Sequence, residues 1–110
     1  MMYLSANASI AEEKLTRYLL VQLPKDDKSK FLASAGYTLA NWRNLEQDLR
    51  NQVLTQPAEF LGKTQFGDKY AIQTTLAGPN GNELSVMTIW MVTNDMTKFV
   101  TLVPDTGGRS

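Results

Sequence analysis

Apolar and polar residues alternate along two stretches in the second half of the chain, residues 69–77 and 83–92. Both stretches are rich in Thr, Ile, Val, Tyr and Trp, the residues that suit a pleated, half-buried surface. Between them, residues 78–81 read Gly-Pro-Asn-Gly, in which proline presets φ and asparagine and glycine accept positive φ. The pattern predicts a β-hairpin with a tight turn at residues 78–81.

The two predicted strands differ in their faces. In the first, the bulkier side chains share one face: Tyr70, Ile72, Thr74 and Leu76. The second is largely apolar on both faces, with Leu84, Val86, Thr88, Trp90 and Val92 on one and Met87, Ile89 and Met91 on the other. A strand that is apolar on both faces is typical of the centre of a sheet. Because helices cover one face, we expect the other to be a cleft or a partner surface.

The first half of the chain shows the three- and four-residue apolar spacing of helices. A first helix is predicted to begin at a capping box formed by Ser9 and Glu12 and to end before Pro24. A charged link follows, in which Asp26 or Asp27 can cap a second, short helix.

Gly36 is placed to be the left-handed residue that ends the second helix. Thr38 is predicted to cap a third helix, which ends before Pro57. After Pro57 the apolar period becomes that of strands, and we predict two further strands at residues 60–65 and 98–103.

Helices followed by strands in a meander predict an α+β fold, with three N-terminal helices packed on one face of a four-stranded antiparallel sheet. A chain of 110 residues is expected to be one domain with its own core. We expect residues 1–8 to form an N-terminal arm, residues 9–103 the single α+β domain, and residues 104–110 a disordered tail.

Histidine and cysteine are both absent, and these absences exclude much chemistry. Without imidazole there is no Ser-His, Cys-His or His-His mechanism, and a zinc site is not expected. Without cysteine there is no disulfide framework. The adjacent carboxylates at residues 12–13 and 26–27 lie at predicted helix starts, where helix dipoles explain them. We therefore expect no metal and no cofactor.

The chain carries 11 basic and 11 acidic residues, so its formal net charge is zero. This balance argues against broad nonspecific nucleic-acid binding but leaves room for a local basic groove. No apolar run approaches membrane-spanning length, and the N-terminal residues lack the regions of a signal peptide. We expect a cytoplasmic protein, or a module of a larger one, that binds no membrane. The sequence leaves its oligomeric state open.

Several short motifs occur in a fixed order along the chain. They are KLTRYLL at 14–20, KSKFL at 28–32, GYT at 36–38 with Asn41, Trp42 and Leu45, KY at 69–70, GPNG at 78–81 and VMTIW at 86–90. This series resembles an uncharacterised family of small bacterial domains, found as free-standing proteins and at the C-termini of polymorphic or contact-dependent toxins. The resemblance implies an antiparallel sheet packed on N-terminal helices. It also suggests kinship with the barnase/EndoU/colicin/RelE-like RNase toxins.

That kinship supplies the first functional hypothesis, a histidine-free ribonuclease in which the ribose 2′-OH attacks the adjacent phosphate. Its candidate residues are Lys28, Thr88 and Tyr70 for catalysis and Trp90, Lys30 and Arg17 for substrate binding. Lys28 would stabilise charge on the phosphorane, Thr88 would hydrogen-bond a phosphate oxygen, and Tyr70 would act as a donor. Trp90 would stack on a base.

Each of these residues also has a purely structural explanation. Lys28 in a charged link is typical of a solvated lysine or a partner of Asp27. Thr88 is β-branched and suits a strand without any further role. Tyr70 and Trp90 are aromatic strand residues, which lie more often in a core than in a binding site.

The second hypothesis is a non-catalytic interaction module of a toxin/antitoxin-like or phage-defence-like gene pair. It would bind a small protein partner through an open sheet face or an edge strand, and RNA would be a partner only under the first hypothesis. A basic cleft joining Lys28, Lys30 and Arg17 to Thr88 favours the ribonuclease. An apolar or neutral face without a cleft favours the interaction module. The sequence leaves open whether the protein is an enzyme.

Overall fold

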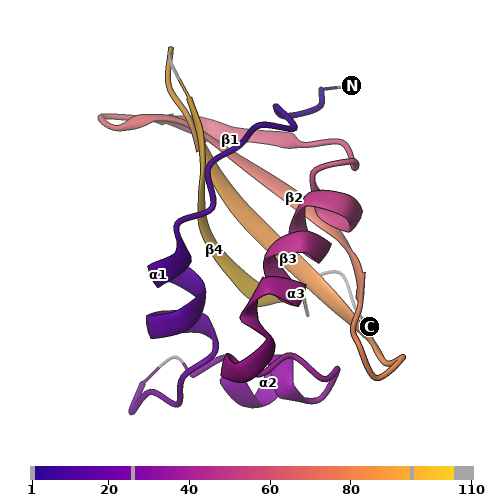
Figure 1. Cartoon of the computed structure of the whole chain (residues 1–110). Helices are drawn as coiled ribbons and strands as arrows, with labels where there is room; N and C mark the ends of the chain where they lie inside the picture. The colour runs from indigo at the N-terminus through magenta and orange to yellow at the C-terminus, as the bar shows by residue number, and fades with distance from the viewer. Residues whose placement is uncertain (1, 26, 95, 106–110) are drawn as a thin grey trace.

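The elements follow the predicted order, with short helical segments first and four strands after them (Figure 1). The structure is a computed structural model, which describes residues 2–25, 27–94 and 96–105. The helical part comprises α1 (Glu12–Lys14), a π-helical segment (Leu15–Leu19), α2 (Ser29–Ala33), a 3-10 turn (Leu39–Asn41), α3 (Trp42–Asp48) and a second π-helical segment (Leu49–Val53). The strands are β1 (Glu59–Thr64), β2 (Gly67–Ala77), β3 (Glu83–Val92) and β4 (Thr97–Pro104). The predicted α+β class is confirmed.

The sheet is the antiparallel meander that the alternation predicted. Its strand order is β1-β2-β3-β4, and each neighbouring pair is antiparallel. Tyr70 lies opposite Trp90 and Ile72 opposite Thr88, so the two arms of the predicted hairpin pair as expected. The bounds of β3 coincide with the predicted strand at residues 83–92.

The turn between β2 and β3 also joins the sheet to the helical part. The Gly81 N–H donates to the Gly78 carbonyl at 3.0 Å, which closes the predicted turn. The Asn80 N–H donates to the Ala35 carbonyl at 3.2 Å, and Asn80 Nδ2 donates to the Ser34 carbonyl at 3.2 Å. The turn is therefore held against the segment that follows α2.

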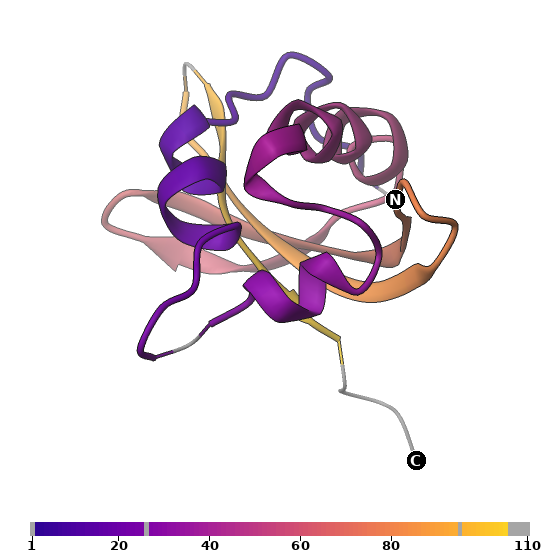
Figure 2. The same ribbon diagram turned by 60° about the horizontal axis from the view of Figure 1, so that its bottom comes forward.

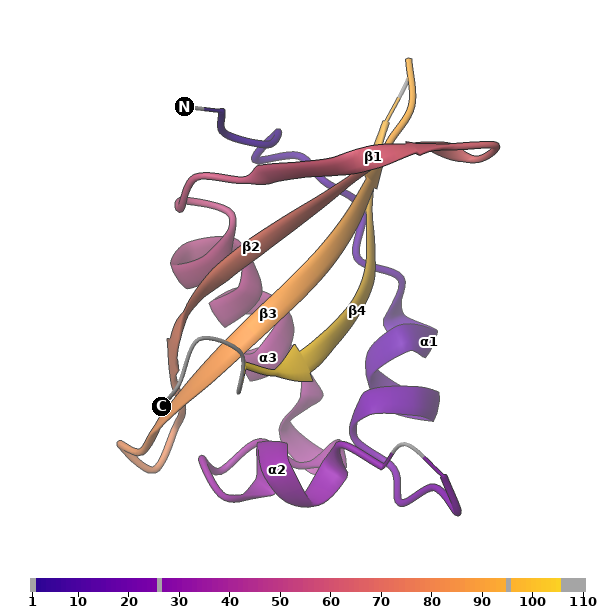
Figure 3. The same cartoon turned by 180° about the vertical axis from the view of Figure 1, so that it is seen from behind.

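The helical segments do not form a regular row. Figures 1 and 3 look from opposite sides, and α3 lies in front of β2 and β3 in the first and behind them in the second. α2 lies instead at the end of the strands, which Figure 2 brings to the front. One core joins these segments to the sheet, and its largest fully buried side chains include Trp90, Tyr37, Leu15, Leu19, Leu32, Leu45, Leu49, Ile72, Leu76 and Leu102. The helices are shorter than predicted.

The predicted capping box at Ser9 is wrong. The N-cap of α1 is Ala11, and no side chain caps this helix. Ser9 pairs with β4 instead: its N–H donates to the Thr97 carbonyl at 2.7 Å, and its carbonyl accepts from the Phe99 N–H at 2.8 Å. These bonds satisfy both backbone groups of Ser9 at the sheet edge, so the helix begins later.

The start of α2 also differs from its prediction. The N-cap is Lys28, without a side-chain cap hydrogen bond. Asp27 lies before the helix, where its Oδ1 accepts from the Leu23 N–H at 3.0 Å and from Ser29 Oγ at 2.8 Å. The bond from the Leu23 N–H is the main cause that lowers the pKa of Asp27, and the bond from Ser29 adds to it. Asp26, the other predicted cap, lies outside the described residues.

Gly36 holds the position that the sequence predicted, whereas Thr38 caps the 3-10 turn before α3, and the N-cap of α3 is Asn41. Gly36 has a φ of 96°, the left-handed conformation expected after a helix. The Thr38 N–H donates to Asn41 Oδ1 at 2.7 Å as part of a capping box. Both residues fix the chain between α2 and the 3-10 turn.

β1 lies one residue earlier than predicted and contains a bulge. Its register against β2 shifts between Phe60 and Gly62. Gly62 has a φ of 149°, which glycine adopts far more easily than other residues. Gly62 therefore kinks the strand and does not end it.

The first residues of the chain pack against the domain. The Ala58 N–H donates to the Met2 carbonyl at 2.7 Å, directly before β1. Leu4 and Ala8 are buried within the core. At the other terminus, Pro104 is the last residue of β4, and residues 106–110 of the predicted tail lie outside the described residues.

Candidate functional site

Thr88 and Trp90 lie on the inner face of β3, inside the core. Both are 0% exposed. Thr88 Oγ1 donates to the Ile72 carbonyl at 3.1 Å and accepts a 2.7 Å hydrogen bond from Trp90 Nε1. The Trp90 ring also meets Phe99 edge-on, with centroids 5.2 Å apart. The polar atoms of both side chains are therefore satisfied within the protein.

Tyr70 lies on the same inner face, opposite Trp90. Its ring meets that of Phe60 on β1 at a centroid distance of 5.4 Å, and it is buried. The predicted hairpin therefore brings Tyr70 and Trp90 together.

The three basic candidates lie on the surface of the helical part. Lys28 Nζ donates to the Tyr18 hydroxyl at 3.3 Å and lies 5.0 Å from the centre of the Tyr18 ring. Lys30 and Arg17 are exposed. Within the described ranges, no hydrogen bond or ion pair joins these cations to Thr88. The six candidates thus form a buried group on the sheet and an exposed basic group, and their catalytic and binding roles stay predictions.

The sheet face turned away from α3 is apolar at its centre. Figure 3 looks onto this face, with the strands in front of α3. We call it the outer face; its members on β2, β3 and β4 are Lys69, Ala71, Gln73, Thr75, Ser85, Met87, Ile89, Met91, Lys98, Thr101 and Val103. On β1, Glu59 lies opposite Ala71 on the same face. Ala71 and Ile89 are buried, while Met87, Met91 and Val103 are half-buried. The methionines and the valine thus form an apolar strip over the central strands.

Charged residues border the outer face at its two ends. Lys69 and Lys98 flank Met91 in one row across the sheet. At the other end, Glu83 begins β3 and Asp105 follows β4. The face is therefore basic at one end, apolar at its centre and acidic at the other end.

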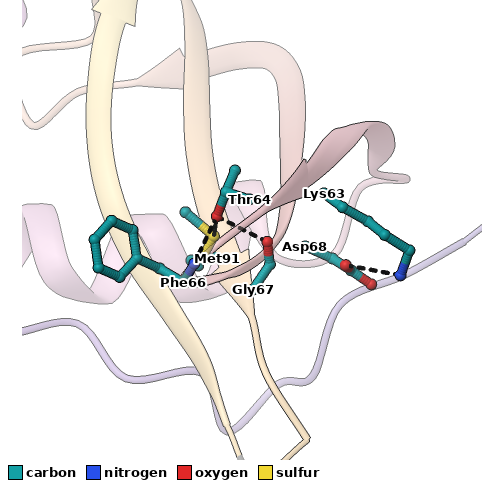
Figure 4. Close-up of polar contacts among 6 residues, drawn as sticks. All are labelled: Lys63, Thr64, Phe66, Gly67, Asp68 and Met91. Atoms are coloured by element: carbon teal, nitrogen blue, oxygen red, sulfur yellow. Dashed lines mark hydrogen bonds and ion pairs between the residues drawn. The ribbon is translucent and has the colours of Figure 1, made fainter.

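Exposed apolar side chains along and beside β1 were not predicted from the sequence. They are those of Met2, Tyr3, Phe60, Leu61 and Phe66, each between 42% and 70% exposed. In Figure 4 the Phe66 ring points away from the ion pair between Lys63 and Asp68. Sequence alternation did not reveal them, because the bulge and the turn place apolar residues outside the regular period.

Tyr37 is a buried titratable residue to which no sequence pattern assigned a role. Its hydroxyl lies 2.6 Å from Asp48 Oδ2 and 3.1 Å from the Ala77 carbonyl oxygen. Burial raises the pKa of Tyr37, and the hydrogen bond to Asp48 and its charge raise it further. The phenol therefore stays protonated and links α3 to the end of β2. Since Tyr37 and Ala77 are 40 positions apart, no local pattern reveals this contact.

The described residues contain no group of three or more side chains suited to hold a metal ion. In the same parts of the chain, no helix has both the length and the apolar character needed to cross a bilayer. The expectation that the protein uses no metal stays a prediction.

Comparison with protein families gives a match over nearly the whole chain. Residues 5–106 match the model of a family described as Domain of unknown function (DUF6883). Neither the curated proteins nor the solved structures give a match.

Proposed function

The chain belongs to this family of domains of unknown function, and we propose that it is a non-catalytic protein-interaction module. It binds a small partner protein through the outer face. The two proteins are encoded together, as in a toxin/antitoxin-like or phage-defence-like gene pair, and act in the cytoplasm. The observation that carries this proposal is the apolar strip on the central strands, on the side of the sheet away from α3.

The surroundings of Thr88 support this function over that of a ribonuclease. A catalytic hydroxyl has to lie within hydrogen-bond reach of its substrate. Thr88 is 0% exposed, and its hydroxyl bonds to Ile72 and Trp90. Lys28 contacts Tyr18 on the surface of the helical part instead. A basic cleft that includes Thr88 would require the core to open.

The composition of the outer face indicates the chemistry of the partner. Methionine side chains adapt their shape to the surface that they meet, which suits Met87 and Met91 to a binding strip. Lys69 and Lys98 favour carboxylates beside this strip. We infer a partner with an apolar patch that is acidic on the side facing the two lysines. The acidic end of the outer face then fixes the orientation of the partner.

Met91→Glu is expected to weaken binding of the small protein encoded by the adjoining gene by about tenfold or more, which is about 1.4 kcal/mol. The new carboxylate removes an apolar contact and repels an acidic partner. Because Lys69 and Lys98 flank this position, the variant is expected to fold normally. Isothermal titration calorimetry with the two purified proteins measures the change.

Met96→Glu is the matched control. Met96 is 47% exposed and lies between β3 and β4, away from the outer-face rows. The affinity of the Met96→Glu variant for the partner protein should stay within about twofold of that of the wild type. Equal losses in the two variants, or no complex between the wild type and the product of the adjoining gene, would contradict the proposal.

Expression in a bacterial host separates the module from a ribonuclease. A non-catalytic module leaves growth and total RNA unchanged, and Lys28→Ala behaves like the wild type. A ribonuclease that uses Lys28 degrades total RNA, and Lys28→Ala abolishes this degradation. Electrophoresis of total RNA after induction measures the difference. If the wild type degrades total RNA and Lys28→Ala does not, the protein is a ribonuclease and the proposed function is wrong.

A further inference from the structure

We propose that Asn80 is a site of spontaneous covalent modification, at which the backbone nitrogen of Gly81 attacks the side-chain amide. The new N–Cγ bond closes a cyclic imide, and the amide group takes up the proton of the Gly81 N–H and leaves as ammonia. Water then opens the ring and leaves aspartate or isoaspartate at position 80. The folded turn slows this reaction, and the product loosens the turn from the helical part. The outer face takes no part, so this inference and the proposed function can fail independently.

The residue that follows Asn80 gives the attacking nitrogen free access. Every other asparagine of the chain precedes a residue with a side chain, whereas Asn80 precedes Gly81. Glycine has no Cβ to crowd its own backbone nitrogen. Asn80 and Gly81 are both exposed, and a Cβ added at Gly81 would meet nothing within 4 Å. The turn therefore has space for the cyclic imide and for the water that opens it.

The native turn hydrogen-bonds each of the groups that react. The Gly81 N–H donates to the Gly78 carbonyl at 3.0 Å. Asn80 Oδ1 accepts from the Asn82 N–H at 2.9 Å, and Asn80 Nδ2 donates to the Ser34 carbonyl at 3.2 Å. The reaction removes the proton from the Gly81 nitrogen and removes Nδ2 from the side chain, so it breaks two of these bonds. We therefore expect it to proceed when the turn opens locally.

The product replaces a hydrogen-bond donor by an acceptor where the turn meets the segment after α2. The Ser34 carbonyl accepts from Asn80 Nδ2 and, at 2.8 Å, from Asn82 Nδ2. A carboxylate at position 80 has no N–H to donate and places negative charge against this carbonyl. Isoaspartate also lengthens the main chain by one carbon, in a turn where a Cβ added at Gly78 would overlap the Ala35 carbonyl oxygen. Modification thus weakens the attachment of the turn.

Peptide mapping of the full chain by mass spectrometry tests the site. After long incubation in mildly alkaline buffer, aspartate and isoaspartate should appear at position 80, at least about tenfold faster in guanidinium chloride than in the folded protein. Asn82 is the internal control: its Nδ2 bonds to the same carbonyl, but Glu83 follows it, so it should react far more slowly. Equal rates in the folded and unfolded chains would overturn the protection by the turn. An unmodified Asn80 in the unfolded chain would overturn the site itself.

Two variants separate the chemistry from the protection by the turn. Gly81→Ala crowds the attacking nitrogen and should nearly stop the reaction in guanidinium chloride, where the fold has no influence. Asn82→Ala removes one of the two side-chain bonds to the Ser34 carbonyl. It should speed the reaction about two- to fivefold in the folded protein and leave the rate in guanidinium chloride unchanged. A Gly81→Ala chain that reacts there as fast as the wild type would overturn the attack by the backbone nitrogen.

Asn80→Asp reproduces one of the two products and tests its effect on the fold. Because the Ser34 carbonyl loses a donor and faces a negative charge, the midpoint of urea denaturation should fall. Asn7→Asp is the matched control, since Asn7 is exposed and its side chain donates no hydrogen bond within the described residues. Its midpoint should stay close to that of the wild type. Equal midpoints for the two variants would overturn the loosening of the turn by the modification.

Discussion

Gly78→Ala is expected to lower the free energy of unfolding by about 3 kcal/mol or more. A Cβ at Gly78 would overlap the Ala35 carbonyl oxygen and lie 2.5 Å from Ala35 Cβ. Neither side can move easily. The Ala35 carbonyl accepts from the Asn80 N–H, and the Gly78 N–H donates to the Asn82 carbonyl at 2.9 Å. The substitution must therefore separate the turn from the end of α2.

Gly81→Ala is the matched control in the same turn. Its φ of 91° disfavours alanine by about 1–2 kcal/mol, but a Cβ there would meet nothing within 4 Å. We expect a loss of about 1 kcal/mol, from backbone conformation alone. Urea denaturation followed by circular dichroism gives both free energies of unfolding. A loss at Gly78 no larger than that at Gly81 would contradict the close approach of the turn to Ala35.

The comparison of these two glycines also shows how far local sequence predicts this fold. The residues Gly78 to Gly81 predict a turn, because each has a conformational preference that a turn requires. Nothing in them indicates that Gly78 lies against Ala35, which is 43 positions earlier in the chain. Local preference therefore predicted the turn but not its contact with the helical part.

The central hairpin was predictable because the alternation of apolar and polar residues in its sequence agrees with which side chains are buried. Ile72 and Val86 are buried on the inner face, while Gln73 and Ser85 are exposed on the other. A period of two that coincides with burial fixes both the element and its orientation. β1 lacks this agreement, since five of its six residues are exposed and its register against β2 shifts at a bulge.

The helical part was harder to predict because tertiary contacts decide its boundaries. The capping box of Ser9 and Glu12 suggested that a first helix begins at Ser9, but the backbone of Ser9 bonds to β4. The α-helical hydrogen bonding also changes to the wider π form in Leu15–Leu19 and Leu49–Val53. The apolar spacing along these two segments does not indicate this change.

The same limit applies to the candidate site: local patterns predicted part of it, and tertiary contacts decide the rest. Alternation placed Thr88 and Trp90 on one face of a strand, and this placement is confirmed. It did not reveal whether that face opens to solvent or lies in the core. The position of Lys28 beside Tyr18 depends on the path of the chain between α1 and α2, which no periodic pattern specifies.

Thr88→Val is expected to lower the free energy of unfolding by about 2 kcal/mol. Valine nearly keeps the shape of threonine but lacks the hydroxyl. Trp90 Nε1 then loses its acceptor and the Ile72 carbonyl loses a donor, and a buried unsatisfied polar group costs about 1–3 kcal/mol. Urea denaturation measures the loss. Thr88→Ser is the control: it keeps the hydroxyl and loses one methyl group, at a cost of about 1 kcal/mol.

A double-mutant cycle with Trp90→Phe tests the origin of that loss. Phenylalanine has no N–H, so Thr88→Val should cost about 1 kcal/mol less in this background than in the wild type. Equal costs in the two backgrounds would contradict a structural bond between the two side chains. The Thr88 hydroxyl is 0% exposed and bonds to Ile72 and Trp90 within the core. Thr88 therefore supports the sheet behind the outer face, and folded Thr88→Val should bind the partner protein with wild-type affinity.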